Sequence, residues 1–84
     1  MKKYTLSVHA EKVIEERKIK KEWIEITINN PDSVEPDMKD QELIHHLKVI
    51  KENDKRVLRV IYNKSVEPLL IVSSFFDRRM KGKL

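Results

Sequence analysis

RVLRVIYN at residues 56–63 and LLIVSSFFD at residues 69–77 decide the fold of this chain. Both runs are rich in β-branched and aromatic residues, the composition typical of strands. Polar and turn-forming residues separate them, beginning with Asn63 and ending with Pro68. Two strands joined by so short a connection pair most simply as an antiparallel hairpin. The second run is apolar on both faces near its start, so we expect it to be buried there.

The N-terminus predicts a short strand and then a helix. Residues 4–7 alternate weakly and are interpreted as the strand. Ser7 is a suitable N-cap because its hydroxyl accepts a hydrogen bond from a free amide of the first helical turn. Apolar residues then recur at helical spacing at Ala10, Val13 and Ile14. The pattern therefore predicts a helix over residues 9–18 with a narrow apolar face.

A second helix is predicted over residues 20–30. Its inner stripe consists of Trp23, Ile24, Thr27 and Ile28. Asn30 is expected to adopt the left-handed conformation at the helix end, and Pro31 prevents continuation. Because the connection over residues 18–20 is short, the two helices are expected to form an antiparallel hairpin.

The middle of the chain is less clear. Residues 31–40 hold two prolines, which an edge strand around Val34 would tolerate. Residues 43–51 fit two patterns equally well. One is a helix opened by Asp40, with an apolar stripe of Leu43, Ile44, Leu47 and Ile50; the other is a strand with one face of Leu43, His45, Leu47 and Val49. Periodicity alone does not decide between them.

These elements predict an α+β fold, in which a helix hairpin packs on one face of a small antiparallel sheet. The chain has 84 residues, so we expect a single domain over residues 1–84. It contains no cysteine, which excludes disulfides and zinc–thiolate sites. No apolar run approaches a membrane span, and the polar N-terminus does not resemble a signal peptide. The expected location is therefore the cytoplasm.

Charge is unevenly distributed along the chain. Residues 55–84 contain eight Lys or Arg residues and two acidic ones, whereas residues 31–54 contain three basic and seven acidic residues. A basic C-terminal third beside an acidic middle favours an anionic partner at one face. The alternative is an ordinary solvated surface, which charge alone does not distinguish.

Three segments together carry a family resemblance: HAEKVIEERKIKKEWIEITINNPDSVEPD (9–37), VLRVIYN (57–63) and IVSSFFDRR (71–79). The pattern resembles a family of small bacterial proteins of unknown function related to the RelE/ParE superfamily of toxins, with BrnT as a near relative. The resemblance implies a roughly four-stranded sheet with the helix pair on one side, and a strand rather than a helix at residues 43–51. It also implies a basic open sheet face, an RNA, ribosome or gyrase target, and a small antitoxin partner.

RNA cleavage without a metal requires a group that accepts the 2′-hydroxyl proton, a group that protonates the leaving oxygen, and cations that stabilise the phosphorane. Arg59 alternates with Val57 and Ile61, and is expected on the face away from the helices. The predicted catalytic residues are Arg59, His45, His46 and Arg79. The predicted nucleic-acid-binding residues are Lys48, Arg56, Arg59, Arg78, Arg79 and Lys81. The alternative is that these cations are solubilising and pair with Glu52, Asp54 or Asp77.

The histidines are expected to serve acid–base chemistry or structure rather than a metal. His45 and His46 are consecutive, so on a strand they point to opposite faces, and one of them can face the arginines. The sequence offers no third ligand beside either, and no metal or cofactor is predicted. Tyr62 is interpreted as a core or edge ring, with stacking on RNA as the alternative.

Three functions are compatible with the sequence. The first is a toxin-like protein that cleaves mRNA or blocks translation, with RNA or the ribosome as target. The second is a non-enzymatic domain that binds a protein or nucleic acid, and the third is a protein that self-associates through an exposed strand. Active RelE-like enzymes often carry a Tyr or His near the C-terminus, whereas the tail after Asp77 has neither.

Overall fold

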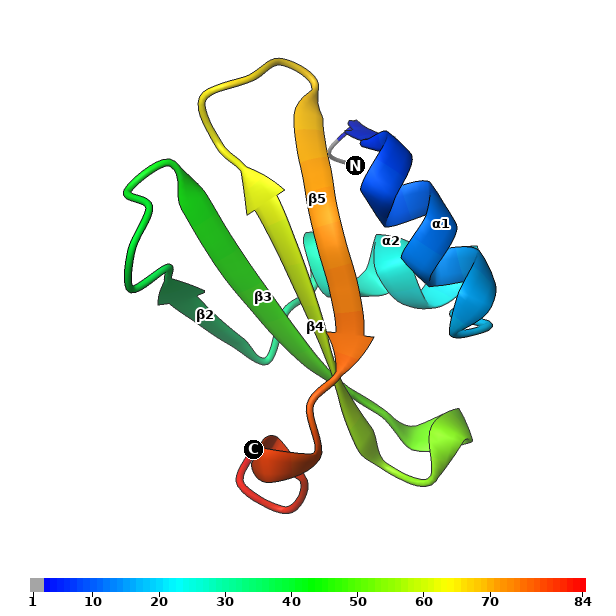
Figure 1. Cartoon of the computed structure of the whole chain (residues 1–84). Coiled ribbons are helices and arrows are strands. Elements are labelled where there is room, and N and C mark those ends of the chain that lie inside the picture. Colours follow the sequence, from blue (N-terminus) through cyan, green and yellow to red (C-terminus); the bar gives the residue numbers. More distant parts are fainter. Residues whose placement is uncertain (1–2) are drawn as a thin grey trace.

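A computed structural model, which describes residues 3–84, shows a five-stranded mixed sheet with both helices on one face (Figure 1). The helices are α1 (Val8–Glu16) and α2 (Lys21–Asn29). The strands are β1 (Tyr4–Leu6), β2 (Ser33–Pro36), β3 (Leu43–Ile50), β4 (Arg56–Asn63) and β5 (Leu69–Phe76). Short 3₁₀ turns follow β3 and β5, as η1 (Lys51–Asn53) and η2 (Arg78–Met80).

The sheet has five strands in the order β1-β5-β4-β3-β2, whereas roughly four antiparallel strands were expected. The extra feature is β1, which pairs in parallel with β5, so that Tyr4 lies opposite Leu69. A three-residue strand carries little alternation, and its partner lies near the other end of the chain. Only tertiary packing brings the two together. The other pairings are antiparallel, as expected.

The remaining strand predictions are confirmed. The hairpin of β4 and β5 forms, with Arg59 opposite Phe75. Residues 43–50 are a strand paired with β4, which resolves the helix-or-strand ambiguity. An edge strand forms around Val34 and pairs with β3. The edge strands β1 and β2 are short, and they leave the last residues of β5 and β3 without an outer partner strand within residues 3–84.

The helix ends follow local chemistry. The hydroxyl of Ser7 accepts a hydrogen bond from the Ala10 amide at 3.0 Å, so the predicted N-cap is confirmed. The prediction for Asn30 is wrong, because its φ of −137° and ψ of 61° are not left-handed. The residue before a proline is pushed towards extended conformations, and Pro31 therefore outweighs the preference of asparagine for the left-handed region.

The helices do not form the expected antiparallel hairpin. In Figure 1 they lie across one another, with α1 packed against β5 and α2 against β3 and β4. The topology explains this arrangement, because the chain leaves the sheet at β1 on one edge and returns at β2 on the other. The helical segment must therefore cross the whole sheet. No helix among residues 3–84 is long and apolar enough to span a membrane.

The main core lies between the helices and the sheet. Leu58, Val60 and Tyr62 belong to it, as the alternation of β4 predicts. The opposite face also contains buried side chains, because Leu47 and Val57 are 0% and 1% exposed. There η2 packs against β4, and the Asp77 amide donates to the Val57 carbonyl at 2.8 Å. The C-terminal turn therefore folds back onto the sheet beside Arg59.

Candidate functional site

Arg59 lies on the sheet face away from the helices, as predicted, but it is buried. Only 8% of the residue is exposed. Its Nε and Nη2 donate to Oδ2 of Asp77 at 3.0 and 2.8 Å, and its Nη1 donates to Oε1 of Glu35 at 3.2 Å. Two carboxylates of the protein therefore match its charge. Arg59 orients acidic side chains in this structure and does not present a free guanidinium to a phosphate.

Asp77 connects Arg59 to the C-terminal turn. Its carboxylate also accepts from the backbone amide of Arg79 at 3.0 Å and from Nε of Arg79 at 3.2 Å. Burial raises the pKa of Asp77, but the hydrogen bonds from Arg79 and Arg59 outweigh burial and leave this pKa below its ordinary value. The same contact raises the pKa of the exposed Arg79 guanidinium. Asp77 therefore fixes the start of η2 on the sheet.

His45 extends this network on β3. Its Nδ1 lies 2.8 Å from Nη1 of Arg59, and its Nε2 lies 2.7 Å from Oδ1 of Asp37. An arginine only donates hydrogen bonds, so Nδ1 must be the acceptor and the ring proton must lie on Nε2. The pKa of Asp37 is lowered by this bond and by the amides of Asp40 and Lys39. Both ring nitrogens of His45 are thus hydrogen-bonded, and neither is free to act as a general base.

His46 points to the opposite face, as expected for consecutive strand residues. It is 3% exposed. Nδ1 lies 3.1 Å from the Thr27 carbonyl oxygen, and Nε2 lies 3.0 Å from the Tyr62 hydroxyl. The carbonyl accepts only, so Nδ1 carries the proton and the Tyr62 hydroxyl donates to Nε2. Its burial within the core makes His46 a structural residue, and it does not reach the Arg59 network.

Lys48 does not join the other predicted cations. It lies in register with Leu58, whose side chain faces the helices. Its Nζ is 3.3 Å from Oδ1 of Asp32, in the segment between α2 and β2. The expectation that Lys48 contributes to the same face as Arg59 is therefore not met. Among residues 3–84, no group of His, Asp and Glu side chains is arranged to hold a metal ion.

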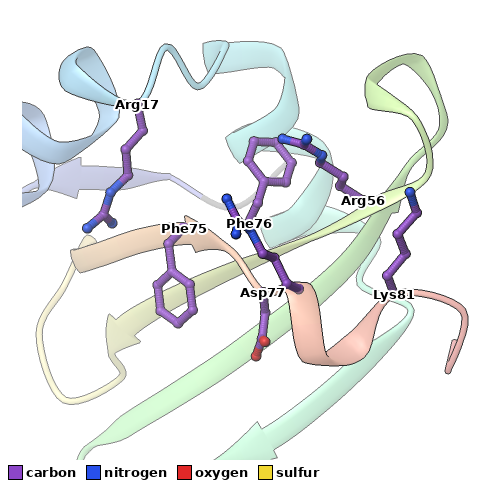
Figure 2. A pocket seen from close by; sticks show the side chains of 7 residues that line it. Arg17, Arg56, Phe75, Phe76, Asp77 and Lys81 are labelled. Atoms are coloured by element: carbon purple, nitrogen blue, oxygen red, sulfur yellow. The ribbon is translucent and has the colours of Figure 1, made fainter.

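Three predicted cations instead meet in a pocket at the end of β5. This basic pocket has a volume of about 680 Å³ and contains the cations Arg17, Arg56, Arg78 and Lys81. Phe75 and Phe76 also line it, and Figure 2 shows their rings directed to opposite sides of the strand. Arg17 was not identified as a binding residue from the sequence. Its place after the last turn of α1 gave no sign that it would reach β5.

Positive charge dominates the basic pocket. Arg56 and Arg78 make no side-chain hydrogen bond or ion pair within residues 3–84. The guanidinium of Arg17 donates to the Ser74 carbonyl at 2.7 Å, which leaves its charge uncompensated. Lys81 pairs with the exposed Asp54 at 3.0 Å. In Figure 2 the carboxylate of Asp77 is directed away from the labelled cations. This carboxylate forms ion pairs with Arg59 and Arg79 instead.

A second pocket lies on the other side of Phe75. This pocket, which we call the polar pocket after its charged side chains although most of its exposed lining is apolar, has a volume of about 560 Å³ and is lined by Glu35, His45, Arg59, Phe75 and Arg79, among others. It therefore combines an aromatic wall with the buried network described above. Phe75 lines both pockets, so the two are adjacent. A ligand that extends past this ring can occupy both.

A family model described as a domain of unknown function, DUF4258, matches residues 6–75. The chain belongs to this family. No curated protein and no solved structure matches it. Membership of a family of unknown function is thus confirmed, whereas nothing in these comparisons connects the chain with the RelE/ParE superfamily.

The two pockets relate differently to the DUF4258 match. Glu35, His45 and Arg59 of the polar pocket lie within residues 6–75. The basic pocket also draws on Arg78 and Lys81, which follow the matched segment. In this DUF4258 protein, the C-terminal turn therefore supplies half of the four cations of the basic pocket.

Proposed function

We propose that this DUF4258 protein binds single-stranded RNA through the basic pocket and acts as a toxin-like inhibitor of translation. One observation carries the proposal: four cations and two phenylalanine side chains line one pocket at the end of β5, and Lys81 is the one of these cations that forms an ion pair within residues 3–84. Arginine suits phosphate because its planar guanidinium offers paired donors and stays charged. Exposed bases of single-stranded RNA stack on aromatic side chains, which the phenylalanines can supply.

Binding fits the geometry better than cleavage does. Cleavage would need a free acid–base group near a phosphate-binding arginine. Arg59 is paired with two carboxylates, and both nitrogens of His45 are already hydrogen-bonded. His46 is buried on the other face. We therefore propose that the protein inhibits translation by binding to RNA or the ribosome. A small antitoxin is the partner that the family resemblance implies.

RNA binding is tested with a fluorescein-labelled single-stranded RNA and anisotropy measured between about 50 and 300 mM salt. Each phosphate contact contributes about −0.7 to the slope of log K against log salt, so four contacts give a slope of about −3. The double variant Arg56→Gln/Arg78→Gln should reduce the slope to about −1.5 and weaken binding at least about tenfold.

A matched control removes two cations outside the pocket, with Lys12→Gln/Lys64→Gln. This variant has the same net charge as the test variant and should retain most of the affinity. No binding at 50 mM salt, or an equal loss in both double variants, would contradict the proposal.

The toxin-like role needs a test in cells. Strong induction of the wild-type chain should arrest growth and protein synthesis, and the Arg56→Gln/Arg78→Gln variant should relieve the arrest while the Lys12→Gln/Lys64→Gln control does not. Normal growth and normal incorporation of labelled amino acids after induction would remove this role but leave RNA binding intact.

A further inference from the structure

We infer that the polar pocket is a nucleobase subsite that selects guanine, and this inference rests on the proposed binding of RNA in the adjacent basic pocket. Phe75 lines both pockets at the part of β5 that β1 does not cover, so a strand whose phosphate lies among the cations can pass this ring to reach the polar pocket. Phe75 provides one apolar wall there, and Met38, 96% exposed, lies at the rim. A flat, partly apolar ring is the kind of ligand that such walls accommodate.

Glu35 is the group that reads the base. Its side chain is 43% exposed, and Oε1 is held by Nη1 of Arg59 at 3.2 Å. The second carboxylate oxygen has no hydrogen-bond partner within residues 3–84. Arg59, whose side chain is only 9% exposed and which is also paired with Asp77, therefore holds Glu35 in place without using its full accepting capacity. A carboxylate fixed in this way is a preorganised acceptor.

The other carboxylates near the pocket are occupied. Oδ1 of Asp37 accepts from His45, and Oδ2 accepts from the amides of Lys39 and Asp40 at 3.0 and 2.9 Å. Asp77 accepts from Arg59 and Arg79. Glu35 is consequently the carboxylate at this site with an oxygen that has no hydrogen-bond partner within residues 3–84. Hydrogen-bond donors of a ligand in the polar pocket are therefore expected to bind Glu35.

Hydrogen-bond complementarity then selects the base. Guanine presents two adjacent donors on its Watson–Crick edge, N1–H and the N2 amino group, which match the two oxygens of a carboxylate. Uracil presents one N–H between two carbonyl oxygens, and those oxygens would repel the carboxylate. Adenine and cytosine each place a ring-nitrogen acceptor beside their amino donor. Guanine is therefore the one common base with two neighbouring donors and no acceptor between them.

The test uses the full chain with a fluorescein-labelled uridine hexamer and with versions of this hexamer that carry one central guanosine, adenosine, cytidine or inosine. A well-placed bidentate pair is worth roughly 1–3 kcal/mol of discrimination between bases, so the guanosine hexamer should bind about tenfold more tightly than the uridine hexamer. Inosine keeps N1–H but lacks the N2 amino group, and it should lose most of this preference. The inosine comparison needs no protein variant and is independent of any effect on folding.

Glu35→Gln should reduce the guanosine preference to about twofold or less, because an amide offers only one acceptor oxygen. The matched control Glu42→Gln neutralises an exposed acid outside both pockets and should leave the preference unchanged. Thermal melts of both variants check that they fold. Equal affinities for all hexamers, or a preference that survives either inosine or Glu35→Gln, would overturn the inference. RNA binding without base preference would remove the subsite alone, whereas no RNA binding would remove the proposed function as well.

Discussion

The ion pair between Arg59 and Asp77 should be a major contributor to stability, and Asp77→Asn tests this directly. Both side chains are nearly inaccessible, at 9% and 3% exposure. Loss of one charge from a buried pair typically costs about 3–5 kcal/mol because the partner charge remains buried. Arg59 retains Glu35, which is 43% exposed and screened by water, so we expect the lower end of this range, about 3 kcal/mol.

The measurement is equilibrium unfolding in urea, followed by the fluorescence of Trp23. This is the single tryptophan of the chain, and its ring packs edge-on against Phe76 with centroids 5.8 Å apart. For a domain of this size, each kcal/mol corresponds to roughly 4–8 °C in melting temperature, so Asp77→Asn should melt about 12–24 °C lower than the wild type. Arg79→Gln serves as the control. It should have a much smaller effect, because this side chain is 81% exposed.

A double-mutant cycle separates the pair from its surroundings. Arg59→Met alone should also destabilise the protein, because it leaves the Asp77 carboxylate buried without its main partner. The double variant Arg59→Met/Asp77→Asn should cost less than the sum of the single variants by about 1.5 kcal/mol or more. A cost below about 1 kcal/mol for Asp77→Asn, or strictly additive effects, would refute the reasoning.

Three further outcomes follow from the local contacts. The pKa of Asp77 is lowered by folding, so its contribution to stability is complete above the unfolded-state pKa of about 4 and is lost as the pH falls through the lower folded-state value. Urea titrations between pH 2 and 7 should therefore show that the free energy of unfolding falls more steeply with decreasing pH for the wild type than for Asp77→Asn. Equal slopes for the two proteins would argue against this contribution of Asp77. Tyr62→Phe removes the donor to Nε2 of the buried His46 and should cost about 1–2 kcal/mol in the same unfolding assay without affecting the proposed binding of RNA. Ser7→Ala removes the cap of α1 and should cost about 1 kcal/mol, whereas Ser7→Gly should cost only a few tenths.

Local patterns in the sequence were sufficient for most of the secondary structure. The capping chemistry of Ser7, the helical spacing after it and the β-branched run of β4 each depend on neighbours within a few residues. Such signals are present in the chain before it folds. The assignment of Arg59 to the face away from the core also follows from simple alternation along β4. The family resemblance, rather than periodicity, decided correctly that residues 43–50 form a strand.

The site depended on contacts that no local pattern encodes. Arg59 was expected to be available to a phosphate, but Glu35 from β2 and Asp77 from beyond β5 converge on it. Likewise, the basic pocket unites Arg17 with residues that lie about forty to sixty positions further along the chain. The parallel pairing of β1 with β5 belongs to the same class of long-range contact.

By itself, the sequence determined most of the helices and strands, with β3 left ambiguous, as well as the concentration of positive charge near the C-terminus and the face of β4 on which Arg59 lies. Only the tertiary structure decided which of those charges are neutralised inside the protein and which remain available at its surface. The physical reason is that the net charge at a point depends on every carboxylate within a few ångströms, and those carboxylates come from segments remote in sequence. Arg59 and Arg56 are therefore similar residues on one strand, and folding gives them different roles.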